Sequence, residues 1–129
     1  MGIQNDLNKA LGRHNVEVKF SKNSLSDYKS YPEGTRKIIV ALILRQGTKK
    51  NSLLKPEGNG QPLQSPLTGF AEIKPKGLNM RIIYRPRKFE GVVRMEIIAI
   101  GPRDKDEVYK IAVKRLSRFN EEMDKKKKC

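Results

Sequence analysis

The chain has 129 residues, 36% of them apolar, which is enough for the core of one modest domain and hardly for two. No apolar run approaches the roughly 20 residues of a membrane-spanning helix, and the single cysteine, Cys129, excludes an internal disulfide and a thiolate metal cluster. Lys and Arg number 28 against 14 Asp and Glu, and the resulting net charge of +14 favours polyanions as partners.

The first 15 residues are polar, with only scattered apolar positions at Ile3, Leu7 and Leu11. We expect them to form an appendage, either a short amphipathic helix or no stable structure. They also lack the apolar stretch of a signal peptide, so we expect a cytoplasmic protein with no membrane partner. One domain is then expected over residues 16–119, followed by a basic tail over residues 120–129.

A strand and a helix are expected next. Residues 16–20 alternate between apolar and polar side chains, which is typical of a half-buried strand. Ser24 and Asp27 have the spacing of a capping box, which predicts a helix, and Pro32 ends it. The apolar run at residues 38–44 fits either a buried strand or a helix packed on a sheet, because periodicity alone does not separate the two.

Three antiparallel strands are expected in the second half of the chain. Residues 46–66 are rich in Gly, Pro, Lys and Asn and predict a long loop. The pattern then stays strand-like up to Ile100, with turns at residues 75–77 and 87–91. The last strand, residues 92–100, is almost continuously apolar, so we expect it to be the central and most buried one.

The alternation of side chains along these strands places charged residues on shared faces. Glu72 and Lys74 share one face of the first strand, and Arg81 and Arg85 share one face of the second. Glu72 and Lys74 are therefore expected to be neighbours.

A final helix is expected after Gly101 and Pro102, with Asp104 or Asp106 as its cap. Tyr109 lies in its first turn, where free backbone N–H groups and the helix dipole favour an anion such as phosphate. Tyr109 is off the apolar stripe by which the helix would dock on the sheet, which consists of Val108, Ile111, Ala112, Leu116 and Phe119.

Four segments stand out by their order and spacing. Residues 16–21 read Val-Glu-Val-Lys-Phe-Ser, residues 67–70 read Leu-Thr-Gly-Phe, and residues 80–84 read Met-Arg-Ile-Ile-Tyr. Residues 97–109 read Ile-Ile-Ala-Ile-Gly-Pro-Arg-Asp-Lys-Asp-Glu-Val-Tyr. Together they resemble the first strand, the Leu-X-Gly strand start, the Arg-hydrophobic-hydrophobic-Tyr strand and the Gly-X-Arg to Glu-Val-Tyr segment of RelE-family toxins, in the RelE/ParE superfamily.

The resemblance implies an α+β fold in which an N-terminal strand and two helices pack on a small antiparallel sheet with a C-terminal helix. It implies a toxin of a type II toxin–antitoxin system, an mRNA interferase that cleaves mRNA on the ribosome. A cognate antitoxin would be the protein partner. Neither a metal nor a cofactor is implied.

The resemblance also assigns candidate site residues. Glu72 stands where the family has the first of its two strand lysines, and Thr68 stands where it has an arginine just before the strand-start glycine. Apart from the resemblance, Lys76 and Arg85 are candidate RNA-binding residues. The catalytic candidates are Lys74, Arg81, Arg103, Tyr109 and Glu72.

These residue types suit RNA cleavage because RNA supplies its own nucleophile, the ribose 2′-hydroxyl next to the phosphorus. Arg81 and Arg103 would clamp the phosphate oxygens, whose negative charge rises in the transition state. Glu72 or Lys74 would take the 2′-proton, the lysine only if its pKa is depressed. Tyr109 would assist proton transfer or stack on a base. Such a scheme requires no metal ion.

Two other functions remain open on the same scaffold. ParE toxins share the fold, act on DNA gyrase, and generally lack the cleavage set that this sequence keeps at Arg81, Arg103 and Tyr109. The other is a non-catalytic RNA-binding or host-interaction protein, which Glu72 makes credible. Purely structural roles are the remaining alternative, such as an exposed ion pair of Glu72 with Lys74.

Overall fold

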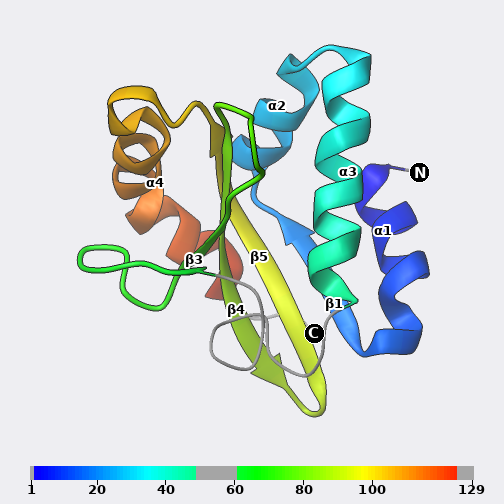
Figure 1. Ribbon diagram of the computed structural model, residues 1–129. Coiled ribbons are helices and arrows are strands. Elements are labelled where there is room, and N and C mark those ends of the chain that lie inside the picture. Colours follow the sequence, from blue (N-terminus) through cyan, green and yellow to red (C-terminus); the bar gives the residue numbers. More distant parts are fainter. Residues whose placement is uncertain (1, 49–60, 125–129) are drawn as a thin grey trace.

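The computed structural model describes residues 2–48 and 61–124, which are arranged in three layers (Figure 1). A five-stranded sheet lies between one helix on one face and three helices on the other, so the expected α+β class is confirmed. None of the helices in these residues is both long and apolar enough to cross a membrane. Residues 49–60 of the expected loop and 125–129 of the expected tail lie outside the described residues. The helices are α1 (Ile3–Leu11), α2 (Lys22–Ser30), α3 (Glu33–Gly47) and α4 (Glu107–Asp124).

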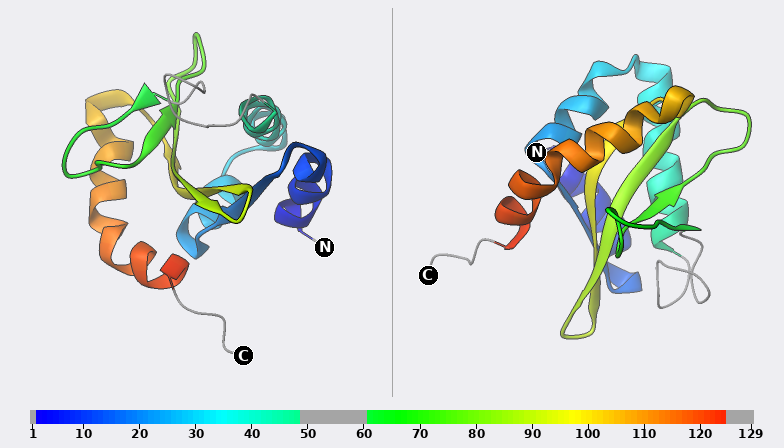
Figure 2. Two further views of the ribbon diagram at one scale, coloured as in Figure 1. Left: turned by 90° about the horizontal axis from the view of Figure 1, so that it is seen from below. Right: turned by 90° about the vertical axis from the view of Figure 1, so that its left-hand side faces the viewer.

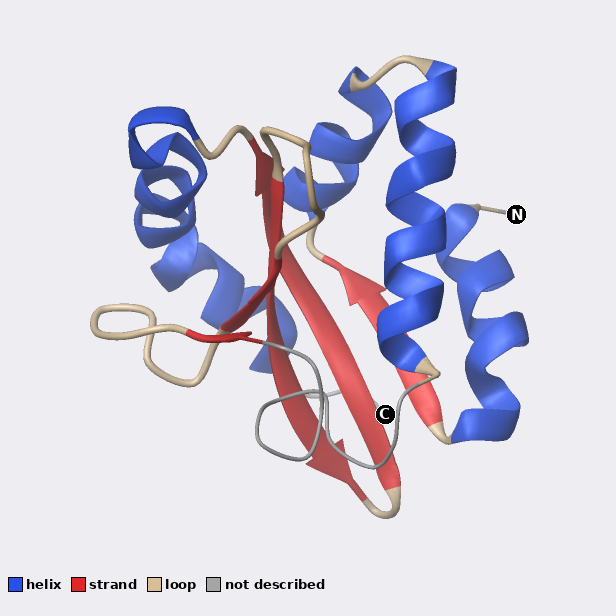
Figure 3. Ribbon diagram, viewed as in Figure 1, coloured by secondary structure: helices blue, strands red, loops and turns tan. Residues whose placement is uncertain are grey.

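The sheet is mixed, with strand order β1-β5-β4-β3-β2 (Figure 3). The expected meander is confirmed, because β3, β4 and β5 pair in antiparallel fashion, while the N-terminal strand β1 joins the sheet parallel to β5. The β4–β5 turn is tighter than expected and consists of Glu90 and Gly91, both with positive φ. The strands are β1 (Val16–Phe20), β2 (Gln61–Pro62), β3 (Ala71–Ile73), β4 (Arg81–Phe89) and β5 (Val92–Gly101).

Strand β5 is apolar along most of its length because both of its faces are covered (Figure 2). Ile97 faces the core under α1, α2 and α3, whereas Ile98 and Ala99 face the core under α4. A bulge causes this change, since Ile83 pairs with Ala99 and Tyr84 pairs with Ile97, which leaves Ile98 unpaired. The strand expected to be central, β5, is thus an inner strand, but the middle position in the strand order belongs to β4.

Residues 1–15, expected to be an appendage, are part of the domain where the structure describes them. Helix α1 and the short 3₁₀ helix Gly12–His14 lead directly into β1, and Leu7 and Leu11 are buried in the core. Helix α3 approaches closely at Gly47, where a Cβ atom would lie 2.9 Å from the Leu11 methyl carbons. The amphipathic-helix alternative for this segment is therefore the correct one.

Helix α1 also closes the outer edge of the sheet. The side-chain oxygen of Asn8 accepts a hydrogen bond from the backbone N–H of Val18 at 2.6 Å. Gln4 does the same for the N–H of Phe20 at 2.7 Å. Two edge groups of β1 that would otherwise be open to a further strand are thus occupied by side-chain amides.

Helix α2 begins with a different cap from the expected one. The Ser21 side chain accepts from the N–H of Ser24 (3.1 Å), and the Ser24 side chain accepts from the N–H of Ser21 (2.9 Å), which is a reciprocal capping box. Asp27, the predicted partner of Ser24, instead accepts hydrogen bonds from Arg115. The undecided run at residues 38–44 is helical and lies within α3.

Helix α4 docks by the expected apolar stripe and is fixed by polar contacts as well. In its middle, the Arg115 guanidinium donates to both carboxylate oxygens of Asp27 (2.7 and 3.0 Å) and to the carbonyl of Ile98 (2.9 Å). Residues 120–124, expected to belong to the basic tail, continue this helix. Its fully packed side chains are Val108, Ala112, Phe119 and Met123.

Candidate active site

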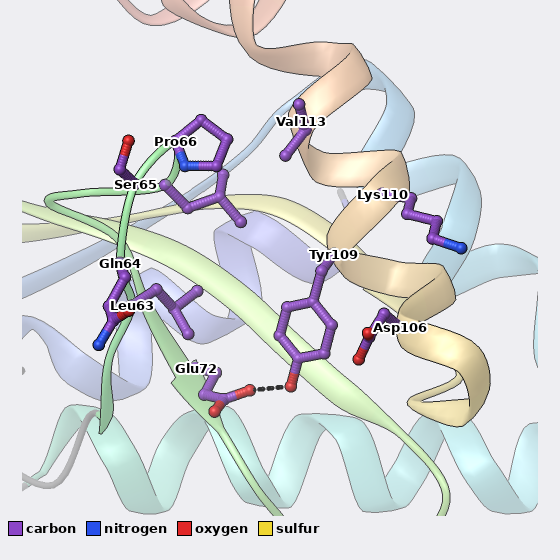
Figure 4. A pocket seen from close by; sticks show the side chains of 10 residues that line it. Leu63, Gln64, Ser65, Pro66, Glu72, Asp106, Tyr109, Lys110 and Val113 are labelled. Atoms are coloured by element: carbon purple, nitrogen blue, oxygen red, sulfur yellow. Dashed lines mark hydrogen bonds between the residues drawn. The ribbon is translucent and has the colours of Figure 1, made fainter.

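Three side chains from different elements meet at one end of the sheet. Glu72 lies in the middle of β3, Arg81 begins β4, and Tyr109 lies in the first turn of α4. The Tyr109 hydroxyl donates a hydrogen bond to Oε1 of Glu72 (Figure 4). Arg81 Nε lies 3.7 Å from the same oxygen. We call Glu72, Arg81 and Tyr109 the trio.

Among the described residues, one N–H donor of the Arg81 guanidinium has no hydrogen-bond acceptor. Its Nη1 donates to the backbone carbonyl of Met80 at 2.9 Å. Its Nε is buried, has no hydrogen-bond partner there, and reaches Glu72 only at ion-pair distance. A buried donor without an acceptor is unfavourable, so an anion that binds here would gain a hydrogen bond that the protein alone does not satisfy.

The trio also shifts the acidity of the phenol. Burial raises the pKa of Tyr109 to about 12, and the hydrogen bond and charge of Glu72 act in the same direction, while Arg81 partly opposes them. Tyr109 is therefore protonated at neutral pH. It can donate a proton or a hydrogen bond, but it cannot act as a base there.

A cationic hollow of about 650 Å³ adjoins Arg81. Four basic side chains and one carboxylate line it among the described residues, so its charge suits a phosphate group. The Asn79 side-chain oxygen accepts from the backbone N–H groups of Arg103 and Asp104, each at 3.1 Å, and so fixes the loop that carries Arg103. We call this the basic hollow; its charged residues are Lys74, Lys76, Arg81, Arg103 and Asp104.

A second hollow, of about 670 Å³, lies between the segment that precedes β3 and the start of α4 (Figure 4). Glu72 and Tyr109 line it, whereas Arg81 lines the basic hollow. We call it the tyrosine hollow; it is lined by Leu63, Gln64, Ser65, Pro66, Leu67, Glu72, Asp106, Tyr109, Lys110 and Val113.

No family model matches this sequence, and no curated protein is significantly similar to it. Solved structures are similar in fold. A mutant E. coli toxin RelE in the free state is 21% identical with a TM-score of 0.55, over 77% of this chain and 95% of that one. The YoeB/ParE toxin from Agrobacterium tumefaciens is 15% identical with a TM-score of 0.52, over 67% of this chain and 97% of that one. The chain has the RelE/ParE toxin fold.

A third structure, the isolated E. coli RelE toxin, is 18% identical with a TM-score of 0.50, over 77% of this chain and 96% of that one. Each of these solved structures is covered almost completely, so the shared fold extends over nearly the whole length of each of them. Identities of 15% to 21% establish the fold but not the reaction.

On this RelE/ParE fold, most of the sequence-predicted candidates come together. Lys74, Lys76, Arg81 and Arg103 line one hollow, and Arg81 links it to Glu72 and Tyr109. Glu72 is not the exposed partner of Lys74 considered above. Its side chain is buried and contacts Arg81 and Tyr109, whereas Lys74 is exposed.

Arg85, a candidate RNA-binding residue, lies apart from this group. Its Nε donates to Glu96 at 2.8 Å, and its terminal nitrogens donate to Asn120 (3.0 Å) and Asp124 (3.3 Å). Its guanidinium also lies over the Phe119 ring, 5.2 Å from the centroid. These contacts fix the far end of α4, so Arg85 has a structural role and we no longer expect it to contact RNA.

Two residues of the site were not recognised from the sequence. Asn79 fixes the backbone of the Arg103 loop, and Asp106 lines the tyrosine hollow. The position of Asn79 in a turn before a strand gave no hint of its partner, since that partner is 24 residues away. Among the described residues, no group of three or more His, Cys, Asp and Glu side chains has an arrangement suited to a metal ion.

Proposed function

We propose that this protein is a toxin endoribonuclease that cleaves mRNA, on the ribosome, by metal-independent attack of a ribose 2′-hydroxyl. One observation carries the proposal: Arg81 contacts Glu72, the acceptor of the Tyr109 hydrogen bond, and also lines a hollow with three further basic side chains. A base, an acid and a phosphate-binding group are thus within reach of one phosphodiester.

In the proposed reaction, the scissile phosphate binds in the basic hollow. The 2′-oxygen attacks the adjacent phosphorus while its proton passes to a base, and the bond from phosphorus to the 5′-oxygen breaks as that oxygen gains a proton. The products are a 2′,3′-cyclic phosphate and a 5′-hydroxyl end. Neither water nor a metal ion is consumed or required in this scheme.

The trio supplies the groups that the reaction needs. Glu72 is the preferred base, because a carboxylate accepts a proton at neutral pH, whereas a lysine such as Lys74 does so only when its pKa is depressed. Arg81 and Arg103 neutralise the charge that develops on the phosphate oxygens. Tyr109, protonated because its pKa is about 12, donates toward the leaving oxygen or the phosphate.

The proposed partners follow from this reaction and from the fold. The substrate is mRNA, the ribosome presents it, and a cognate antitoxin neutralises the toxin in the cytoplasm. A net charge of +14 fits binding to rRNA and mRNA phosphates.

The deciding experiment is to incubate the purified protein with translating ribosomes and with a short RNA, and to map the product ends. We expect new ends that carry a cyclic phosphate and a 5′-hydroxyl, and on the short RNA they should form equally in the presence of a chelator. Arg81→Ala should lower the cleavage rate by about a hundredfold or more. The matched control is Arg118→Ala, an exposed arginine of α4 that lines neither hollow.

The alternatives give different results in the same samples. A ParE-like protein would leave the RNA intact and inhibit supercoiling by DNA gyrase. A non-catalytic RNA-binding protein would bind the RNA without cutting it. Full cleavage by a folded Arg81→Ala variant would remove Arg81 from the proposed site.

A further inference from the structure

The two hollows that the trio lines differ in charge. The basic hollow has four basic side chains against one carboxylate among the described residues. The tyrosine hollow has two carboxylates, Glu72 and Asp106, against the single ammonium of Lys110. A phosphate is therefore favoured in the basic hollow and disfavoured in the tyrosine hollow.

The walls of the tyrosine hollow suit a flat, partly polar group. Leucine, proline and valine side chains provide apolar surface, and the Tyr109 ring provides an aromatic one. Val113 remains 38% exposed on α4, which leaves apolar surface open to a ligand. Gln64 and Asp106 add hydrogen-bonding groups at this hollow (Figure 4). This combination is typical of a site for a nucleobase, which stacks on apolar and aromatic surface and hydrogen-bonds at its edge.

Asp106 is held at the hollow by an unusual backbone. Lys105 and Asp106 both have positive φ, 52° and 56°, which non-glycine residues rarely adopt. The Asp106 N–H donates to the carbonyl of Arg103 at 3.0 Å, and the N–H of Val108 donates to the carbonyl of Pro102 at 3.0 Å. The same short turn thus fixes Arg103 at the basic hollow and Asp106 at the tyrosine hollow.

We propose that the tyrosine hollow is a nucleobase subsite in which Asp106 selects guanine next to the scissile phosphate. A carboxylate accepts hydrogen bonds but donates none when ionised, so it favours a base with two adjacent N–H donors, as guanine has at N1 and N2. The Gln64 amide can donate to the guanine O6. This inference rests on the proposed function for the neighbouring phosphate, and it adds a base preference that the cleavage chemistry alone does not give.

The test is to titrate the protein with the four ribonucleoside 3′-monophosphates and with inorganic phosphate, followed by nuclear magnetic resonance. We expect guanosine 3′-monophosphate to bind at least about tenfold more tightly than the uridine compound. Asp106→Asn should remove that preference and leave the affinity for inorganic phosphate unchanged. Asp6→Asn, an exposed aspartate of α1, is the matched control and should keep the preference.

A second variant tests the hollow itself. Val113→Trp should fill it and lower the affinity for all four mononucleotides by about tenfold, and the thermal unfolding of the variant shows whether it folds. Equal affinities for the four compounds in the unmodified protein, or a preference that survives Asp106→Asn, would overturn the inference. RNA cleavage without base selection would support the proposed function and refute the nucleobase subsite. Base selection without cleavage would refute that function and keep the subsite.

Discussion

The Glu72 carboxylate and an incoming phosphate would compete for the same guanidinium. Glu72 Oε1 lies 3.7 Å from Arg81 Nε, a buried donor with no hydrogen-bond partner among the described residues. In the proposed reaction, the charge of Glu72 therefore weakens the attraction of Arg81 for a phosphate in the basic hollow. In that proposed reaction, the same carboxylate would both take the proton and weaken phosphate binding.

Glu72→Gln separates these two effects. We expect the single-turnover cleavage rate to fall by about a hundredfold or more, because the amide cannot take the 2′-proton. Binding of an RNA with a 2′-deoxyribose at the cleavage position should tighten, because the competing charge is gone. An unchanged cleavage rate would assign the base to another group, with Lys74 the next candidate.

Tyr109→Phe tests the acid. The pKa of Tyr109 is raised to about 12, so the neutral phenol is favoured in the folded protein. Its contribution to stability is present below pH 10, the ordinary pKa, and is lost as the pH rises toward 12. We expect cleavage to fall by about a hundredfold without unfolding. The measurement is the difference in absorbance between the unmodified protein and the Tyr109→Phe variant as the pH rises. The phenolate of Tyr109 should appear in it only as the pH approaches 12. Its appearance near pH 10 would contradict the buried contact with Glu72.

A candidate site residue could be predicted when it belongs to a sequence motif. It could not be predicted when only a contact in the folded chain brings it to the site. Spacing and resemblance made Arg81, Arg103 and Tyr109 candidates, and the structure places Arg81 and Arg103 at one hollow and Arg81 and Tyr109 beside Glu72. The bond from Tyr109 to Glu72 joins residues 37 positions apart, and no local pattern encodes it. Arg85 was assigned to RNA because period-two alternation gives the face of a side chain but not what covers that face, which here is α4.

At the scale of elements, α1 shows how a short helix can protect a sheet. A parallel edge strand exposes backbone donors to any partner strand. Here Asn8 and Gln4 occupy two of those donors, and Leu7 and Leu11 anchor the helix in the core. The helix therefore both completes the core and blocks the edge.

Asn8→Ala tests this arrangement. It leaves the N–H of Val18 without its partner, so we expect a loss of about 1–3 kcal/mol in the free energy of unfolding, measured with urea. Lys9→Ala, at the next position and exposed, is the control and should change the free energy little. Equal effects of the two substitutions would mean that the edge contact contributes nothing.

Elements were predictable where the periodicity was long or strictly alternating. The meander and α4 were found for this reason. The run at residues 38–44 stayed ambiguous, because a helix that is half-covered by α1 and the sheet has apolar residues on several sides. The packing of helix α1 in the core was not predicted, because its three scattered apolar residues can be recognised as core residues only once their contacts with α3 and β1 are known.

At the scale of the whole molecule, the net charge of +14 predicts a strong dependence of RNA binding on salt. A short RNA with a 2′-deoxyribose at the cleavage position should bind more weakly as salt rises, as measured by fluorescence anisotropy. Lys74→Ala should reduce the slope of log K against log salt by about one, since it removes one phosphate contact.

The control for this measurement is Lys88→Ala. Lys88 is exposed near the other end of β4, seven residues from Arg81 and thus roughly 20 Å away along the strand. It should leave the slope for the short RNA unchanged. Equal slopes for Lys74→Ala and the unmodified protein would place the phosphate outside the basic hollow.

Side-chain hydrogen bonds hold helix α4 to the rest of the domain at three positions along its length. They join Tyr109 to Glu72, Arg115 to Asp27, and Asn120 and Asp124 to Arg85. Each added residue turns the helix by about 100°. One inserted residue between two of these contacts would therefore point one of the side chains away from its partner. An insertion of seven residues, about two turns, would restore the direction but move the later contact by about 10 Å along the axis, so the spacing between these contacts tolerates no insertion. Length variation in such chains should accumulate beyond Asp124 rather than inside the helix.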